Sequence, residues 1–253
     1  MSTEHKIYHT LRLASAMCLI GHGLFGIITK AVWCNYLAVA GIDQTMAYQL
    51  MPLIGIVDII MGISLLLFPI RAVALWLVLW GFMTAAMRPL SGEPFAELIE
   101  RAGNFGAPLT LLLLCPNAKT FKGWFQKMQP PGTISKEDLE KVILCLRITA
   151  CLLLVGHGWL NLIGKKGLLG QYESIGFKDP ILLSYIIGII EIACGAYFIA
   201  VRPLHRFILL LFIWKIGSEL FYPQWEILEW VERGGSYGIL LSLYFAVRKT
   251  YLE

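Results

Sequence analysis

Residues 180–201 decide the fold class, because they read PILLSYIIGIIEIACGAYFIAV and contain a single charged residue, Glu191. A helix rises about 1.5 Å per residue, so this stretch is long enough to cover the roughly 30 Å of hydrocarbon in a bilayer. A transmembrane β-strand would alternate apolar and polar residues with a period of two, and this stretch does not alternate. It therefore predicts a membrane-spanning helix.

Seven further apolar blocks of similar length accompany this stretch. In chain order, the eight blocks cover residues 11–29, 50–70, 73–90, 94–114, 146–164, 180–201, 203–222 and 225–247. The chain of 253 residues is 57% hydrophobic and 15% charged, with a mean hydropathy of +0.68, whereas soluble domains are about 25% charged. Its net charge of +4 is spread without a dense basic run, which argues against a nucleic-acid partner. The sequence predicts an all-α integral membrane protein with eight transmembrane helices.

The two halves of the chain share motifs at a nearly constant offset. Gly21-His22-Gly23 recurs as Gly156-His157-Gly158 at an offset of 135, and the segment from Glu97 to Arg101 recurs from Glu229 to Arg233 at an offset of 132. Motifs that stay in order while the offset drifts are typical of a duplicated unit. We expect a first four-helix unit at residues 1–115, a cytoplasmic linker at 116–141 and a second four-helix unit at 142–253.

Basic residues predict the orientation of the helices. If the amino terminus lies inside, the inner side carries 13 of the 21 Lys and Arg residues, in agreement with the positive-inside rule. Four crossings return the chain to its starting side, so the two four-helix bundles would have the same orientation and form a parallel repeat. We expect a plasma (inner) membrane protein, surrounded by the lipid bilayer, with both termini in the cytoplasm.

Each predicted unit places a histidine and a carboxylate at one depth. His22 and Asp58 lie at similar heights on the first two helices of the first unit, and His157 and Glu191 repeat this arrangement in the second. Ionisable groups are costly inside a bilayer, so each needs a partner. Two interpretations stay open: core residues satisfied by packing, or candidate catalytic residues, in which the carboxylates orient histidines that exchange protons.

A second group of ionisable residues gathers at the predicted outer side. The fourth and eighth helices begin with carboxylates and an arginine on one face, lysines end the first helix of each unit, and a Lys–Glu pair lies in the seventh helix. These groups either tie the helices together at the water boundary or bind a quinone or a small sulfur anion. The candidate ligand-binding residues are Lys30, Lys165, Glu97, Glu100, Arg101, Lys215, Glu219, Glu229, Glu232 and Arg233.

The cysteine pattern does not predict a metal centre. The six cysteines include no C-x-x-C pair, which thioredoxin-like redox pairs and zinc ribbons require. A haem held by His22 and His157 stays open as an alternative to a quinone, although no other residue pattern supports it.

These motifs resemble the DoxX/DoxD-like family of small four-helix membrane proteins. The residues that match its first, second and fourth helices are Arg147, His157-Gly158 and Lys165, then Gly188, Glu191 and Gly195, then Glu232-Arg233-Gly234-Gly235. The first unit fits less closely, because it has Asp58 in place of the glutamate and Ala102-Gly103-Asn104 after Arg101. Members of the family consist of one such unit, so this chain would contain two copies of it.

The resemblance implies a link to membrane redox chemistry. Members of the family are similar to the membrane subunit of thiosulfate:quinone oxidoreductase, and others are linked to thiol or oxidative-stress redox complexes. We therefore expect an oxidoreductase subunit, linked to a quinone or a sulfur compound, that works with a redox partner protein. Two alternatives stay open: a non-catalytic carrier or binder of a small hydrophobic or anionic molecule, and a membrane scaffold for a partner protein.

Overall fold

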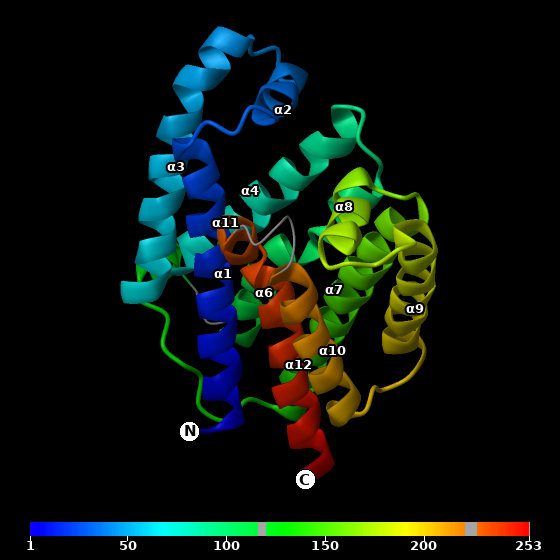
Figure 1. Ribbon diagram of the computed structural model, residues 1–253. Helices are drawn as coiled ribbons and strands as arrows, with labels where there is room; N and C mark the ends of the chain where they lie inside the picture. Colours follow the sequence, from blue (N-terminus) through cyan, green and yellow to red (C-terminus); the bar gives the residue numbers. More distant parts are fainter. Residues whose placement is uncertain (116–119, 221–226, 253) are drawn as a thin grey trace.

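The computed structural model describes residues 1–115, 120–220 and 227–252, and these residues form helices and connecting loops without a β-strand (Figure 1). The helices are α1 (Thr3–Ile27), α2 (Trp33–Val39), α3 (Gln44–Leu67), α4 (Arg71–Leu90), α5 (Ala96–Glu100), α6 (Ala102–Leu114), the 3-10 helix η1 (Phe121–Phe125), α7 (Lys136–Leu162), α8 (Lys166–Ser174), α9 (Pro180–Ala200), α10 (His205–Leu220), α11 (Ile227–Glu232) and α12 (Gly234–Leu252). The all-α fold class predicted from the sequence is confirmed.

Most of the described part of each predicted apolar block is helical, but two blocks are divided. The fourth block becomes α5 and α6, because the backbone at Arg101 leaves helical geometry (φ −88°, ψ 13°) and its side chain donates to the carbonyl of Glu97. The eighth becomes α11 and α12, separated at Arg233. The predicted end of the seventh block and the start of the eighth fall on residues 221–226, outside the described residues.

Three other elements differ from the sequence prediction. Helix α7 begins at Lys136, so the last part of the expected linker at 116–141 is helical. Its start is fixed by Ser135, whose side chain accepts a hydrogen bond from the backbone amide of Asp138, as an N-cap residue does. Helices α2 and α8 follow α1 and α7 directly, and the pattern of apolar blocks does not predict them because they are short.

Four helices are long and apolar enough to cross a membrane, namely α1, α3, α4 and α9. Helices α3 and α9 turn large apolar side chains outward, and Ile60 and Ile189 are 60% and 62% exposed. Faces of this kind are stable when lipid covers them. Within the described residues, four of the eight predicted spans therefore meet the criteria of length and apolarity.

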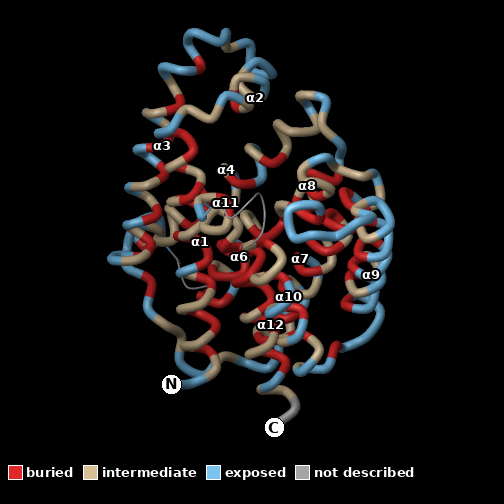
Figure 2. Tube along the Cα trace, in the orientation of Figure 1, coloured by how far each residue is buried: buried red, intermediate tan, exposed pale blue. Residues whose placement is uncertain are grey.

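The centre of the molecule is formed by α1, α6, α7 and α12, where buried residues concentrate (Figures 1 and 2). Helix α3 packs along α1, α9 along α7, α4 beside α6 and α10 beside α12. One continuous apolar core joins the central helices and includes Leu11, Leu111, Leu146 and Leu243. Each half of the chain thus contributes two central and two peripheral long helices.

The short helices α5 and α11 cross from one half of the chain to the other. A Cβ atom added at Gly21 in α1 would lie 2.4 Å from the backbone nitrogen of Glu232 in α11, and one added at Gly156 in α7 would lie 2.3 Å from that of Glu100 in α5. Glycine permits this approach because it carries no side chain. The charged segment of each half therefore lies against the histidine-bearing helix of the other half.

We expect Gly156→Ala to destabilise the protein, because its methyl group would collide with the backbone of Glu100. Overpacking of this kind costs about 1–3 kcal/mol. Gly217→Ala is the matched control, since it lies inside α10 and its added Cβ has no described atom within 4 Å outside the backbone of its own helix. Alanine is favoured over glycine in helices by about 0.5–1 kcal/mol. Thermal unfolding in detergent measures both variants. Equal melting temperatures would contradict the close contact between α5 and α7.

Candidate functional site

The first histidine–carboxylate pair joins α1 to α3. His22 Nδ1 lies 2.7 Å from Asp58 Oδ2, and Trp80 Nε1 in α4 donates to the same oxygen at 3.2 Å. The Asp58 side chain is 2% exposed and that of His22 is 17% exposed. If Nδ1 donates its proton to this acceptor, Nε2 is the ring nitrogen left with a lone pair. The structure therefore brings together the first pair of candidate catalytic residues, and the carboxylate fixes the orientation of the imidazole.

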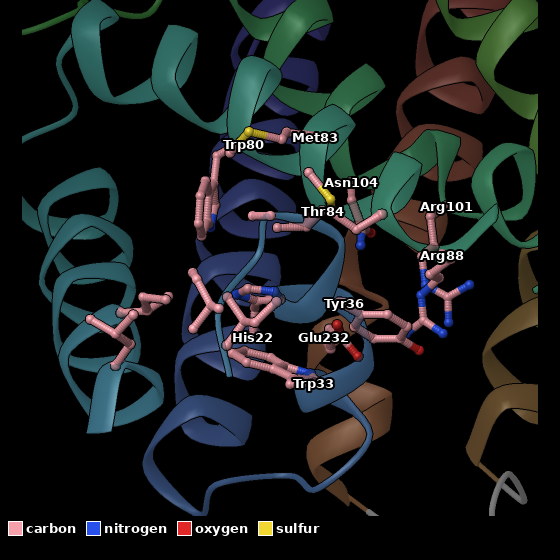
Figure 3. Close-up of a pocket in the computed structure, with 16 residues that line it drawn as sticks. His22, Trp33, Tyr36, Trp80, Met83, Thr84, Arg88, Arg101, Asn104 and Glu232 are labelled. Atoms are coloured by element: carbon pink, nitrogen blue, oxygen red, sulfur yellow. The ribbon is translucent and has the colours of Figure 1, made fainter. Parts of the chain in front are cut away.

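His22 lines a cavity of about 310 Å³ that lies between α1, α2, α3 and α4 (Figure 3). One wall is aromatic, since the Trp33 ring stacks on His22 with ring centroids 4.4 Å apart, and Trp80 meets the same imidazole edge-on at 6.2 Å. Ile54 and Met83 also line the cavity. Small-molecule sites in proteins are concave and mostly apolar, and they begin at about this size.

The polar end of the cavity is formed by Tyr36, Arg88, Arg101, Asn104 and Glu232. Arg88 lies over the Tyr36 ring, 5.0 Å from its centroid. The Tyr36 hydroxyl donates to the carboxylate of Glu93 at 2.5 Å, and burial raises the pKa of Tyr36 above its usual value, so the phenol stays protonated. The cavity therefore combines an aromatic wall at His22 with hydrogen-bonding groups at the other end.

All the candidate ligand-binding residues except Glu232 take part in ion pairs, and we call these pairs the charge network. Arg101 holds Glu97 and Glu100 at 2.6 and 2.8 Å, and Arg233 holds Glu100 and Glu219. The remaining pairs are Lys165 with Glu97, Lys215 with Glu219, Arg88 with Glu97 and, beside them, Lys30 with Glu229. Because Glu100 and Arg233 come from different halves of the chain, the charge network joins the halves.

The second histidine–carboxylate pair is enclosed by other polar side chains. His157 Nδ1 lies 2.6 Å from Glu191 Oε2, and Asn161 Nδ2 lies 3.3 Å from that oxygen. Tyr172 and Ser184 donate their hydroxyl protons to Asn161 Oδ1 at 2.6 and 3.1 Å. The His157 side chain is only 8% exposed. The two pairs thus share a geometry but differ in access: His22 faces a cavity, and His157 lies in a filled polar network.

The sequence analysis did not select the residues that create this difference. Asn161 stands at the position of Gly26 when the halves are aligned at an offset of 135, and this exchange of glycine for a polar residue is a signal that could have been used. Tyr36, Arg88 and Asn104 carry no repeated motif, so only the fold identifies them as lining residues. The sequence pattern does not place Trp33 or Trp80 beside His22, which both rings contact in the fold.

No group of three His, Cys, Asp or Glu residues able to hold a metal ion occurs in the described residues. The polar atoms of the cavity are instead arranged as hydrogen-bonding partners. The imidazole can exchange a proton, the guanidinium groups can donate, and Glu232 can accept.

In a comparison with protein families, residues 142–214 match the DoxX family. The matched segment covers α9 and most of α7 and α10, and it includes His157 and Glu191. No curated protein and no solved structure matches the chain. Residues 142–214 therefore match a DoxX domain, and the long apolar helices of the described residues make this chain a multi-pass membrane protein.

Proposed function

We propose that the chain consists of two tandem DoxX-like units with eight spans, arranged as parallel repeats in the plasma membrane. Matching contacts support the proposal, since α1 packs on α3 as α7 packs on α9. The two termini lie at the same end of the molecule (Figure 1), as an even number of crossings requires. The basic residues near this end favour a cytoplasmic location for both termini.

We further propose that the cavity beside His22 binds the ring of a membrane quinone, and that the protein serves a membrane redox complex. The observation that carries this proposal is the His22–Asp58 pair facing an aromatic, largely apolar cavity. A flat ring would fit against Trp33 and His22 by stacking. Its substituents would meet the hydrogen-bonding groups at the opposite end.

In this proposal the chain supplies orientation and proton exchange. Asp58 accepts from His22 Nδ1 and holds the imidazole in one orientation, so that Nε2 can take a proton from a ring oxygen or return one to it. Trp80 holds the carboxylate of Asp58 in turn. A bound quinone would accept or give electrons, which the redox partner protein would supply or remove.

The charge balance favours a neutral ring over a small sulfur anion. Arg88 and Arg101 line the cavity, but both already hold carboxylates of α5 or its preceding loop. Glu232 adds a further negative charge at the same end. An anion would therefore have to displace an existing ion pair and approach a carboxylate, whereas a neutral ring need do neither.

The first experiment is native mass spectrometry of the protein purified from its own membranes in mild detergent. A retained quinone, alone or with a redox partner protein, would support the proposal. Haem or bound lipid without quinone would count against it.

A variant that fills the cavity provides the second test. Thr84 lines the cavity from α4, so Thr84→Phe is expected to weaken binding of duroquinone, a tetramethyl benzoquinone, by more than about tenfold through loss of space. Leu79→Phe is the control, because Leu79 lies on the same helix with 59% exposure and does not line the cavity. Quenching of tryptophan fluorescence measures both affinities. Equal binding by the two variants would place the quinone site elsewhere.

A further inference from the structure

Glu232 lies at the polar end of the cavity and forms no ion pair with a described lysine or arginine. It lines the cavity together with Arg101 and Asn104, and a small adjoining hollow is formed by the same residues with Glu100, Arg233 and Ser236. Among the described residues, no lysine or arginine nitrogen lies within 4 Å of its oxygens, whereas Glu97, Glu100, Glu219 and Glu229 each have such a neighbour. The carboxylate oxygens of Glu232 can therefore accept hydrogen bonds from a ligand in the cavity.

The position of Glu232 is fixed by the contact between the two halves of the chain. Its backbone lies directly against Gly21, one residue before His22. The corresponding glutamate, Glu100, lies against Gly156 in the same way but is held by Arg101 and Arg233 together. The two glutamates therefore have the same backbone contact but differ in their side chains: Glu100 is held in ion pairs, whereas Glu232 is not and lines the cavity (Figure 3).

We propose that Glu232 makes the cavity selective for a ring that carries a hydroxyl group, so that it binds the quinol form more tightly than the quinone form. This inference rests on the proposed function. An ionised carboxylate can only accept hydrogen bonds. A quinol hydroxyl donates to it, whereas a quinone carbonyl has no proton to donate and would place one acceptor against another.

The neighbouring groups narrow the ligand class further. Arg101 and Asn104 can donate at the same end of the cavity, so a hydroxyl oxygen can accept from one of them while its proton goes to Glu232. A cationic amine would also satisfy Glu232, but it has no lone pair to accept a hydrogen bond from Arg101 or Asn104. The chemistry of the polar end therefore fits a neutral group that both donates and accepts.

The experiment compares duroquinol with duroquinone, which carry the same methyl groups and differ by the two hydrogen atoms that turn the carbonyls into hydroxyls and the quinoid ring into an aromatic one. Both affinities are measured anaerobically by calorimetry on the full chain in detergent. A hydrogen bond to a charged group is stronger than a hydrogen bond to a neutral group. The difference in free energy corresponds to a change in affinity of about tenfold. The wild-type protein should therefore bind duroquinol about tenfold more tightly than duroquinone.

Glu232→Gln should reduce this preference to less than about threefold, because the amide is neutral and can donate to the quinone carbonyl. Glu232→Asp keeps the charge and should retain part of the preference. Glu4→Gln is the control, because it makes the same exchange at a carboxylate that is paired with Lys249 and does not line the cavity. Its preference should equal that of the wild type.

The outcomes separate this inference from the function on which it rests. Equal wild-type affinities for the two forms would overturn the role of Glu232 while leaving quinone binding intact. A preference that survives Glu232→Gln unchanged would do the same. Failure of the wild type to bind either form would overturn the proposed function as well. If Glu232→Gln does not fold, the wild-type ratio and Glu232→Asp still decide the question.

Discussion

Replacing Arg233 by Gln is expected to lower the free energy of unfolding by about 3–5 kcal/mol. Arg233 holds Glu100 and Glu219, whose side chains are 4% and 2% exposed. Removing one member of a buried ion pair is costly, because the remaining charge cannot be solvated by water. Glutamine can donate to one of the carboxylates but cannot neutralise either of them.

The position of Arg233 between the halves increases the expected effect. Glu100 belongs to α5 and Glu219 to α10, so the guanidinium group links helices from both halves of the chain. Lys215 and Arg101 remain as partners of these carboxylates, but they lie on the same or adjoining elements. The variant should therefore weaken contact between the halves as well as stability.

Arg202→Gln is the matched control for this prediction. Arg202 forms one ion pair, with Glu140, and its side chain is 60% exposed. Exposed pairs of this kind contribute about 0–1 kcal/mol. Thermal unfolding in the same detergent compares the two variants. If Arg233→Gln melts at the same temperature as Arg202→Gln, the charge network does not stabilise the fold.

The sequence predicted the long helices because lipid imposes a simple requirement. A span must satisfy every backbone hydrogen bond internally and present apolar side chains outward, so the blocks at 50–70, 73–90 and 180–201 are readable as runs with few charges. The divisions at Arg101 and Arg233 were not readable. At Arg233 the side chain reaches carboxylates of α5 and α10, which is a tertiary interaction. At Arg101 the side chain folds back onto the carbonyl and carboxylate of Glu97.

The contacts between His22 and Asp58 and between His157 and Glu191 followed from matched depth on neighbouring helices. The sequence did not predict the difference between the surroundings of the two pairs, because the repeated motifs do not include the residues that differ between the halves. Asn161 fills the space beside Glu191, and α2 instead brings Trp33 against His22. The crossing of Glu232 into the first half also depends on how the halves pack, which no spacing within one half can reveal.

His22→Gln should lower quinone reduction by about 10²–10⁴-fold, the usual contribution of a positioned general acid or base, whereas His157→Gln should leave the rate within about threefold. Glutamine can still hydrogen-bond to Asp58, but it cannot exchange a proton near neutral pH. The assay uses membranes that carry each variant, with thiosulfate, the donor that the family resemblance implies, and duroquinone as acceptor. Binding of duroquinone to purified His22→Gln should stay within about tenfold of wild type, so that the loss is one of turnover.

The loss of stability is expected to be larger for His157→Gln than for His22→Gln, which is the opposite of the order expected for turnover. His157→Gln disturbs a buried set of hydrogen bonds that includes Glu191 and Asn161, and a buried polar group without its partner costs about 1–3 kcal/mol. His22 faces the cavity, so its replacement should change the melting temperature less. If instead the two variants lose turnover equally, His157 is part of the reaction and its enclosure must open during the cycle; if neither loses turnover, the histidines serve the fold alone.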